Sequence, residues 1–160
     1  MGIRMTTPLS EVENILNESF EILRNEISNS LAKLGVECIG KIRNRPGNKS
    51  WIDRTGNLRS SIGFAVYDYG VNQLQSAFKT VLHGSEGSAE GQKMISQLGR
   101  EYSSAYALVV VAGMNYASHV EALENKDVLA STELWAKSVI DARLERAKKA
   151  AIKKINKLFS

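Results

Sequence analysis

The residues that could carry chemistry are few, and they lie far apart in the sequence. The two histidines are His83 and His119, and the single cysteine is Cys38. A transition-metal site needs several Cys, His or carboxylate ligands at suitable spacing, and neither histidine has a second Cys or His nearby. Cys38 falls on or near the apolar face of a predicted helix, where we expect a buried, unreactive thiol. We therefore expect no metal ion and no cofactor.

No arrangement of catalytic residues is visible in the sequence either. It lacks the G-x-S-x-G turn that presents a nucleophilic serine, and His119 and Glu121 would point in different directions on a helix. The glycines of residues 84–99 do not form a phosphate-binding loop, because neither G-x-G-x-x-G nor G-K-S/T occurs among them. We expect a protein that is not an enzyme, and a small hydrolase is a disfavoured hypothesis.

Length and composition are those of one globular domain. The chain has 160 residues, of which 43% are hydrophobic and 24% charged, and its net charge is +4. A single cysteine permits no intramolecular disulfide and indicates a reducing compartment. No apolar run reaches the roughly 20 residues that span a membrane. The mild positive charge would tolerate nucleic acid nearby without requiring it.

Hydrophobic spacing predicts a long helix at each end of the chain. In residues 8–45 the apolar side chains step by three and four, which places them on one stripe. Two interpretations of this stripe stay open: it packs on a sheet, or part of it meets a neighbouring subunit. Its members are Leu9, Val12, Leu16, Phe20, Leu23, Ile27, Leu31 and Leu34. The second helix, residues 131–159, carries lysines in its C-terminal half at Lys148, Lys149, Lys153, Lys154 and Lys157.

Residues 51–130 between these helices are predicted to form a sheet. From Ser61 onward the apolar residues alternate, a period typical of a strand rather than a helix. The two faces of this strand would carry Ile62, Phe64, Val66 and Asp68 on one side and Ser61, Gly63, Ala65 and Tyr67 on the other.

Further strands are expected at residues 71–82, at 106–113 and, as a short edge strand, at 127–130. The Leu-Val-Val-Val run within 106–113 predicts a central strand that is covered on both faces. The glycine- and serine-rich residues 84–99 read as a loop insertion that contacts a partner. The expected fold class is therefore α+β: one domain over residues 1–160, with a small, mostly antiparallel sheet packed by a long N-terminal helix and a long C-terminal helix.

Two short motifs occur in order on either side of the predicted central strand. Residues 53–62 read D-R-T-G-N-L-R-S-S-I, and residues 115–121 read N-Y-A-S-H-V-E. The first is similar to the D-T-G-x-L-R-x-S-I signature, and the second to the Y-A-x-x-V-E segment, of the HK97 gp10-like family of tailed-phage proteins. The resemblance spans roughly residues 10–123. Members of that family are virion components of the neck or tail, known as tail-completion, head–tail joining or neck proteins.

The resemblance implies a structural virion protein that forms a ring and connects the portal side of the capsid to the tail. Its partners would be further copies of itself and adjacent neck, tail or portal-side proteins. Viral DNA would pass nearby without sequence-specific binding, and no membrane would be involved. The protein would be made in the host bacterial cytoplasm and reside in the virion. We take as candidate subunit contacts Arg54, Asn57, Arg59, Met94, Ile95 and Leu98.

Two alternatives accompany this hypothesis. Arg59 is expected to point outward beside the sheet, where its guanidinium could hold a carboxylate of an adjacent subunit in a bidentate contact, or could only cover its own sheet edge. The alternative function is a small DNA-binding regulatory protein that uses the lysine-rich C-terminal helix. Ring assembly would favour the virion protein, whereas duplex DNA binding that is lost in moderate salt would favour the regulator.

Overall fold

The computed structural model describes residues 7–45, 51, 52, 54–122 and 127–159. It confirms the predicted α+β class, with a long helix at each end of the chain and an antiparallel sheet between them. In chain order the elements are α1 (Leu9–Arg43), α2 (Asn57–Ser60), β1 (Ile62–Asp68), β2 (Val71–Gln75), α3 (Ser85–Leu98), the 3-10 helix η1 (Gly99–Tyr102), β3 (Tyr106–Ala112), α4 (Ala117–Ala122), α5 (Ala130–Ile155) and the 3-10 helix η2 (Asn156–Leu158).

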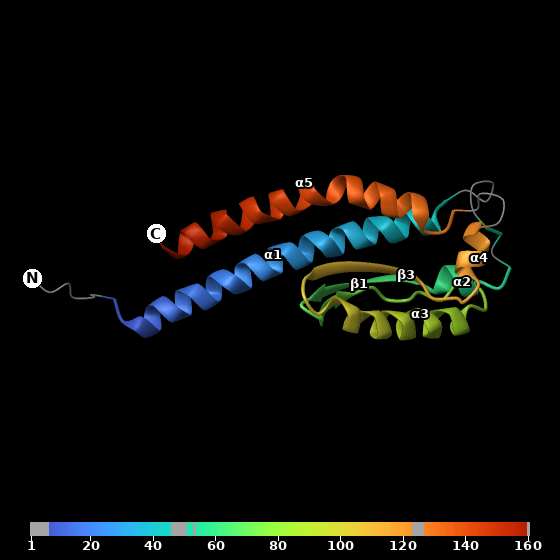
Figure 1. Cartoon of the computed structure of the whole chain (residues 1–160), viewed down its shortest axis with the longest axis horizontal. Coiled ribbons are helices and arrows are strands. Elements are labelled where there is room, and N and C mark those ends of the chain that lie inside the picture. Colours follow the sequence, from blue (N-terminus) through green and yellow to red (C-terminus); the bar gives the residue numbers. More distant parts are fainter. Residues whose placement is uncertain (1–6, 46–50, 53, 123–126, 160) are drawn as a thin grey trace, which may run out of the picture.

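The sheet is enclosed between helices. Its strand order is β2-β1-β3, and β1 is antiparallel to both neighbours. Figure 1 shows α1 on one face of the sheet and α3 on the other, with α5 packed along α1 on the outside. The expectation that residues 106–113 form the central strand is wrong, because β3 lies at the edge and β1 lies in the middle. All seven residues of β1 are buried, whereas β3 is only partly covered.

The alternation predicted for β1 is confirmed. Phe64 and Val66 pack with Leu31 of α1 on one face. Ala65 and Tyr67 pack on the other face with residues of α3 and β3. A period of two therefore places one set of side chains against each helical layer.

Residues 84–99 were expected to form a loop, and this prediction is wrong. They form α3, which packs on the sheet through the fully buried side chain of Ile95. Gly84, Gly87 and Gly91 step by three and four, so they share one helical face. That face lies against α2 and the start of β1: a Cβ atom on Gly87 would stand 1.9 Å from the Asn57 carbonyl oxygen. These glycines permit a close approach of backbones rather than a flexible loop.

Two other predicted strands differ from the structure. The strand expected at residues 71–82 ends at Gln75 as β2. Beyond it Ser76 still pairs with β1, since its N–H donates to the Phe64 carbonyl oxygen (3.0 Å) and its hydroxyl accepts from the Phe64 N–H (2.9 Å). The edge strand expected at 127–130 is absent from the described part of that segment, because α5 already begins at Ala130.

Asp127 and Arg45 join the start of α5 to the end of α1. The Asp127 carboxylate accepts a hydrogen bond from the Ser131 N–H (3.2 Å) and lies 3.0 Å from Nη1 of Arg45. Arg45 Nη2 also donates to the hydroxyls of Ser131 and Thr132. Burial alone would raise the pKa of Asp127, but the hydrogen bonds from Ser131 and the charge of Arg45 outweigh it and hold the pKa below its ordinary value of 3.8.

Asp127→Ala is therefore expected to lower the free energy of unfolding by about 1–2 kcal/mol at neutral pH, as for the loss of a helix cap. Because the pKa is lower in the folded state, this stabilisation is present above the unfolded pKa and is lost as the pH falls through the folded value. Urea unfolding at pH 7 and near pH 3 should show the difference between wild type and variant shrinking at low pH. A difference that is independent of pH would contradict this role.

Candidate subunit interface

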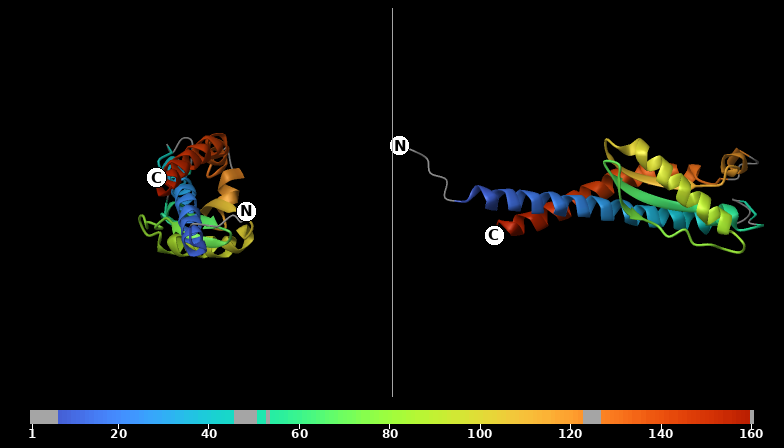
Figure 2. Two further views of the ribbon diagram at one scale, coloured as in Figure 1. Left: turned by 90° about the vertical axis from the view of Figure 1, so that its left-hand side faces the viewer. Right: turned by 90° about the horizontal axis from the view of Figure 1, so that it is seen from below.

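Helix α1 is far longer than the sheet on which it packs. Its 35 residues extend about 52 Å at the usual rise, whereas the seven residues of β1 extend only about 23 Å. Arg24 marks the place where α1 leaves the sheet: its Nε lies 2.7 Å from Oδ2 of the buried Asp68, the last residue of β1. Residues 9–23 of α1 and 147–158 of α5 project beyond the sheet (Figures 1 and 2), and we call them the arm.

The apolar stripe of α1 is covered in one half and bare in the other. Leu31 is buried against β1 and α5, and Leu34 has no exposed surface. On the arm the same stripe continues without cover: the exposed fractions are 63% for Leu9, 37% for Val12, 49% for Leu16 and 63% for Phe20. We call these four residues the arm stripe. Their spacing places them on one side of the helix, so they form a continuous apolar surface rather than scattered contacts.

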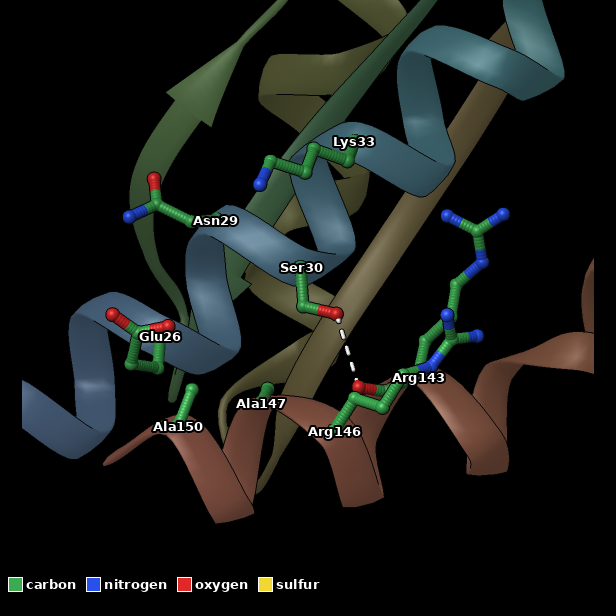
Figure 3. Close-up of a pocket in the computed structure, with 8 residues that line it drawn as sticks. All are labelled: Glu26, Asn29, Ser30, Lys33, Arg143, Arg146, Ala147 and Ala150. Atoms are coloured by element: carbon green, nitrogen blue, oxygen red, sulfur yellow. Dashed lines mark hydrogen bonds between the residues drawn. The ribbon is translucent and has the colours of Figure 1, made fainter. Parts of the chain in front are cut away.

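Next to the arm, α1 and α5 are joined by ion pairs and small side chains. Arg143 of α5 holds Glu37 in a bidentate contact (2.8 and 2.7 Å), and Lys154 pairs with Glu26. Figure 3 shows the shallow hollow, of about 240 Å³, beside this junction, where the Ser30 hydroxyl donates to the Arg143 carbonyl oxygen (3.3 Å). The hollow is lined by Glu26, Asn29, Ser30, Lys33, Arg143, Arg146, Ala147 and Ala150.

The Thr-Gly-Asn motif builds a contact within the chain. Gly56, the residue immediately before α2, has a φ of +83°, a conformation that glycine adopts without steric cost. The Asn57 side chain bridges to α3: its Nδ2 donates to Glu86 (2.9 Å), and its Oδ1 accepts from the Gly87 N–H (3.3 Å). Asn57, a candidate subunit contact, is therefore engaged in docking α3 onto α2.

The two candidate arginines of this region differ in their surroundings. Arg54 is exposed, whereas Arg59 is half-buried and lies close enough to Arg43 to affect its ionisation. Burial, and after it the charge of Arg59, lowers the pKa of Arg43. The Nη2 group of Arg43 donates to the Ile62 carbonyl oxygen (2.7 Å). Arg59 thus belongs to a pair of neighbouring guanidinium groups beside the start of β1.

The three candidate contacts on α3 face the sheet. Ile95 has no exposed surface, and its carbonyl oxygen accepts a hydrogen bond from the Tyr67 hydroxyl (2.7 Å). Ile95 was taken as a candidate contact with another subunit; in the folded chain it forms part of the core on which α3 packs. Met94 and Leu98 are partly buried against the same cluster.

The residues considered for chemistry are dispersed. His83 and His119 are both exposed, and Cys38 is buried as expected, with burial as the main cause of its raised pKa. Among the residues that the structure describes, no three His, Cys, Asp or Glu side chains gather to hold a metal ion. In the same part of the chain, no helix has the length and apolar character needed to cross a membrane.

Comparisons of this chain with protein-family models, with curated proteins and with solved structures found no match.

The sequence already indicated the arm stripe, since one of the two interpretations left open for the stripe of residues 8–45 was that part of it meets a neighbouring subunit. A strand segment of seven residues cannot cover a stripe that runs from Leu9 to Leu34, because the stripe extends about 38 Å along the helix. The excess predicts apolar side chains that the sheet of the same chain leaves uncovered.

Proposed function

We propose that the protein is a structural virion protein of a tailed bacteriophage, a ring-forming component of the neck or tail that joins the portal side of the capsid to the tail. The observation that carries this proposal is the arm stripe, a bare apolar surface on a helix that projects from a folded body. The similarity of residues 53–62 and 115–121 to the motifs of the HK97 gp10-like family supplies the particular role.

An exposed apolar stripe favours association with another chain. Burying partly exposed Leu, Val or Phe side chains contributes roughly 1–2 kcal/mol each, so four of them provide a strong drive to associate. The arm stripe lies at one end of an elongated molecule and the sheet at the other. Contact between an arm and a different surface of the next copy is head-to-tail, and such contacts close into rings when the rotation between copies permits it.

The lysines of α5 fit this role better than tight DNA binding. Lys154 is paired with Glu26 and Lys148 with Glu145, so carboxylates partly neutralise the charge of this helix. A protein that lines a DNA channel benefits from weak and reversible contacts with phosphate, because strong ones would impede passage of the genome.

The test is genetic complementation of phage assembly. In a lysogen with the gene inactivated, we expect filled heads and free tails that fail to join, and infectious titre should fall by several orders of magnitude. The wild-type chain supplied from a plasmid should restore joined particles, and mass spectrometry should find it in those particles. Normal, infectious particles that lack the chain would contradict the proposal.

A further inference from the structure

A groove runs along the outer edge of β3. Its volume is about 400 Å³. Leu34 and Cys38 of α1 lie on one side of it together with Ile140 of α5, and Leu98 and Tyr102 lie on the other. The first three belong to the helical layers on one face of the sheet, whereas Leu98 ends α3 on the opposite face and Tyr102 ends the 3-10 helix η1 that follows it. A groove with walls from both faces must pass across the edge of the sheet.

Strand β3 contributes residues from both of its faces to this groove. Leu108 and Val110 belong to the cluster beneath α1, and Val109 belongs to the cluster beneath α3. Within the residues that the structure describes, β3 pairs with β1 alone, so its other edge offers backbone N–H and C=O groups to a further strand. An open edge of this kind binds an extended segment through main-chain hydrogen bonds, and neighbouring pockets take alternate side chains.

We infer that this groove receives residues 1–6 of a neighbouring copy as an added strand. The segment reads M-G-I-R-M-T, with Met1, Ile3 and Met5 alternating with Gly2, Arg4 and Thr6. An alternating segment presents its apolar residues on one face of a strand. The inference rests on the proposed ring, since it names one of the two surfaces that a head-to-tail contact needs.

The segment cannot reach the groove of its own chain. Leu34 is the first residue of α1 that lines the groove, and it stands 25 positions after Leu9, or about 38 Å along the helix. Ile3 precedes Leu9 by six positions, which span at most about 22 Å when fully extended. The arm carries the start of α1 away from the body of its own chain, so the groove that the segment fills belongs to another copy.

Disulfide trapping between two single-cysteine chains tests this contact. One chain carries Ile3→Cys and the other Leu108→Cys with a C-terminal tag that makes the mixed dimer distinguishable by mass. Both carry Cys38→Ala, because Cys38 is the only native cysteine and lines the groove. Under mild oxidation of the mixture we expect at least about tenfold more mixed dimer than with a control pair, because binding raises the effective concentration of the two thiols. The control pairs Ile3→Cys with Leu74→Cys on β2, which is exposed at 38%.

A third mixture, of the Leu74→Cys and Leu108→Cys chains, and a measurement of mass distinguish the groove contact from the ring. Preferential trapping of Leu74→Cys with Leu108→Cys would show that β2 of the second copy fills the groove and would overturn the inference. The mass of the unsubstituted protein is measured under reducing conditions. If this mass is that of a ring but residue 3 is not trapped, the inference is overturned and the proposed function stands. Trapping of residue 3 without a ring would support the groove contact and contradict the ring. If residue 3 is not trapped and no ring forms, the groove contact and the proposed ring are both overturned.

Discussion

If the protein assembles through its arm as proposed, replacing Leu16 and Phe20 with glutamate is expected to convert the assembly into monomers and to leave the folding of the chain almost unchanged. Leu16 is 49% and Phe20 63% exposed in the folded chain, so the free energy of unfolding should fall by less than about 0.5 kcal/mol. At an interface the same changes remove two apolar contacts worth roughly 1–2 kcal/mol each. They also place two carboxylates on a surface from which association excludes water. A combined loss near 3 kcal/mol weakens association by about 100-fold.

A matched control tests whether the effect depends on where the glutamates are placed or only on adding glutamate to an exposed apolar site. Val36 lies on the same helix and is exposed at 61%, close to the 63% of Phe20, but it lies outside the arm. Val36→Glu should therefore assemble as the wild type does. Light scattering over a concentration series measures the assembly, and urea unfolding followed by circular dichroism measures the folding. Full assembly of the double variant, or equal dissociation by Val36→Glu, would show that the arm stripe is not the interface.

Gly87→Ala is expected to destabilise the fold by about 3 kcal/mol, although alanine is the better helix former. A Cβ atom at this position would stand 1.9 Å from the carbonyl oxygen of Asn57 and 2.6 Å from its carbon. Both atoms belong to backbone, so no side chain can rotate away to relieve the overlap. α3 must then shift from α2, and the hydrogen bond from the Gly87 N–H to the Asn57 side chain is lost or lengthened.

Gly40→Ala is the control for this substitution. Gly40 also lies inside a helix, but nothing stands within 4 Å of a Cβ atom built there. The same change should stabilise the protein by about 0.5–1 kcal/mol through helix propensity alone. Urea unfolding of the two variants should thus give shifts of opposite sign. A stabilising or neutral Gly87→Ala would show that α3 does not pack on α2 as closely as described.

The different surroundings of Gly87 and Gly40 also explain why residues 84–99 were wrongly predicted to form a loop. Glycine signals a loop when it is judged by composition, and residues 84–99 are rich in it. The positions of Gly84, Gly87 and Gly91 carry different information, since steps of three and four describe a helical face from which side chains are excluded. The partner backbone that requires this face comes from residues 56–61, far away in sequence, so no local pattern could reveal the reason.

For the strands, the sequence predicted which side chains share a face but not the order of the strands in the sheet. The alternation in β1 correctly gave its two faces, because a period of two depends only on the strand itself. The Val-rich run of β3 was taken as central, but the helices on both faces of a small sheet can cover an edge strand as well. Strand order depends on pairing between distant segments, and neither strand's composition determines it.

The motif at residues 53–62 was identified from its sequence, but only the structure showed what its side chains touch. Asn57 and Ser60 were available to any partner as far as the sequence could show. In the folded chain Asn57 binds α3, and the Ser60 hydroxyl accepts a hydrogen bond from the Val81 N–H (2.9 Å). The motif therefore fixes how α2, α3 and the residues before α3 meet, and the arm stripe replaces it as the strongest candidate for contact between subunits.

The central claim is that this chain assembles into a ring through its arm. The most direct test is its mass in solution, measured by light scattering after size exclusion at protein concentrations up to several hundred micromolar, with electron microscopy of the largest species. We predict one discrete species whose mass is a whole multiple of 17.6 kDa and whose images show a closed ring. A mass of 17.6 kDa at every concentration, with no larger species, would contradict the account.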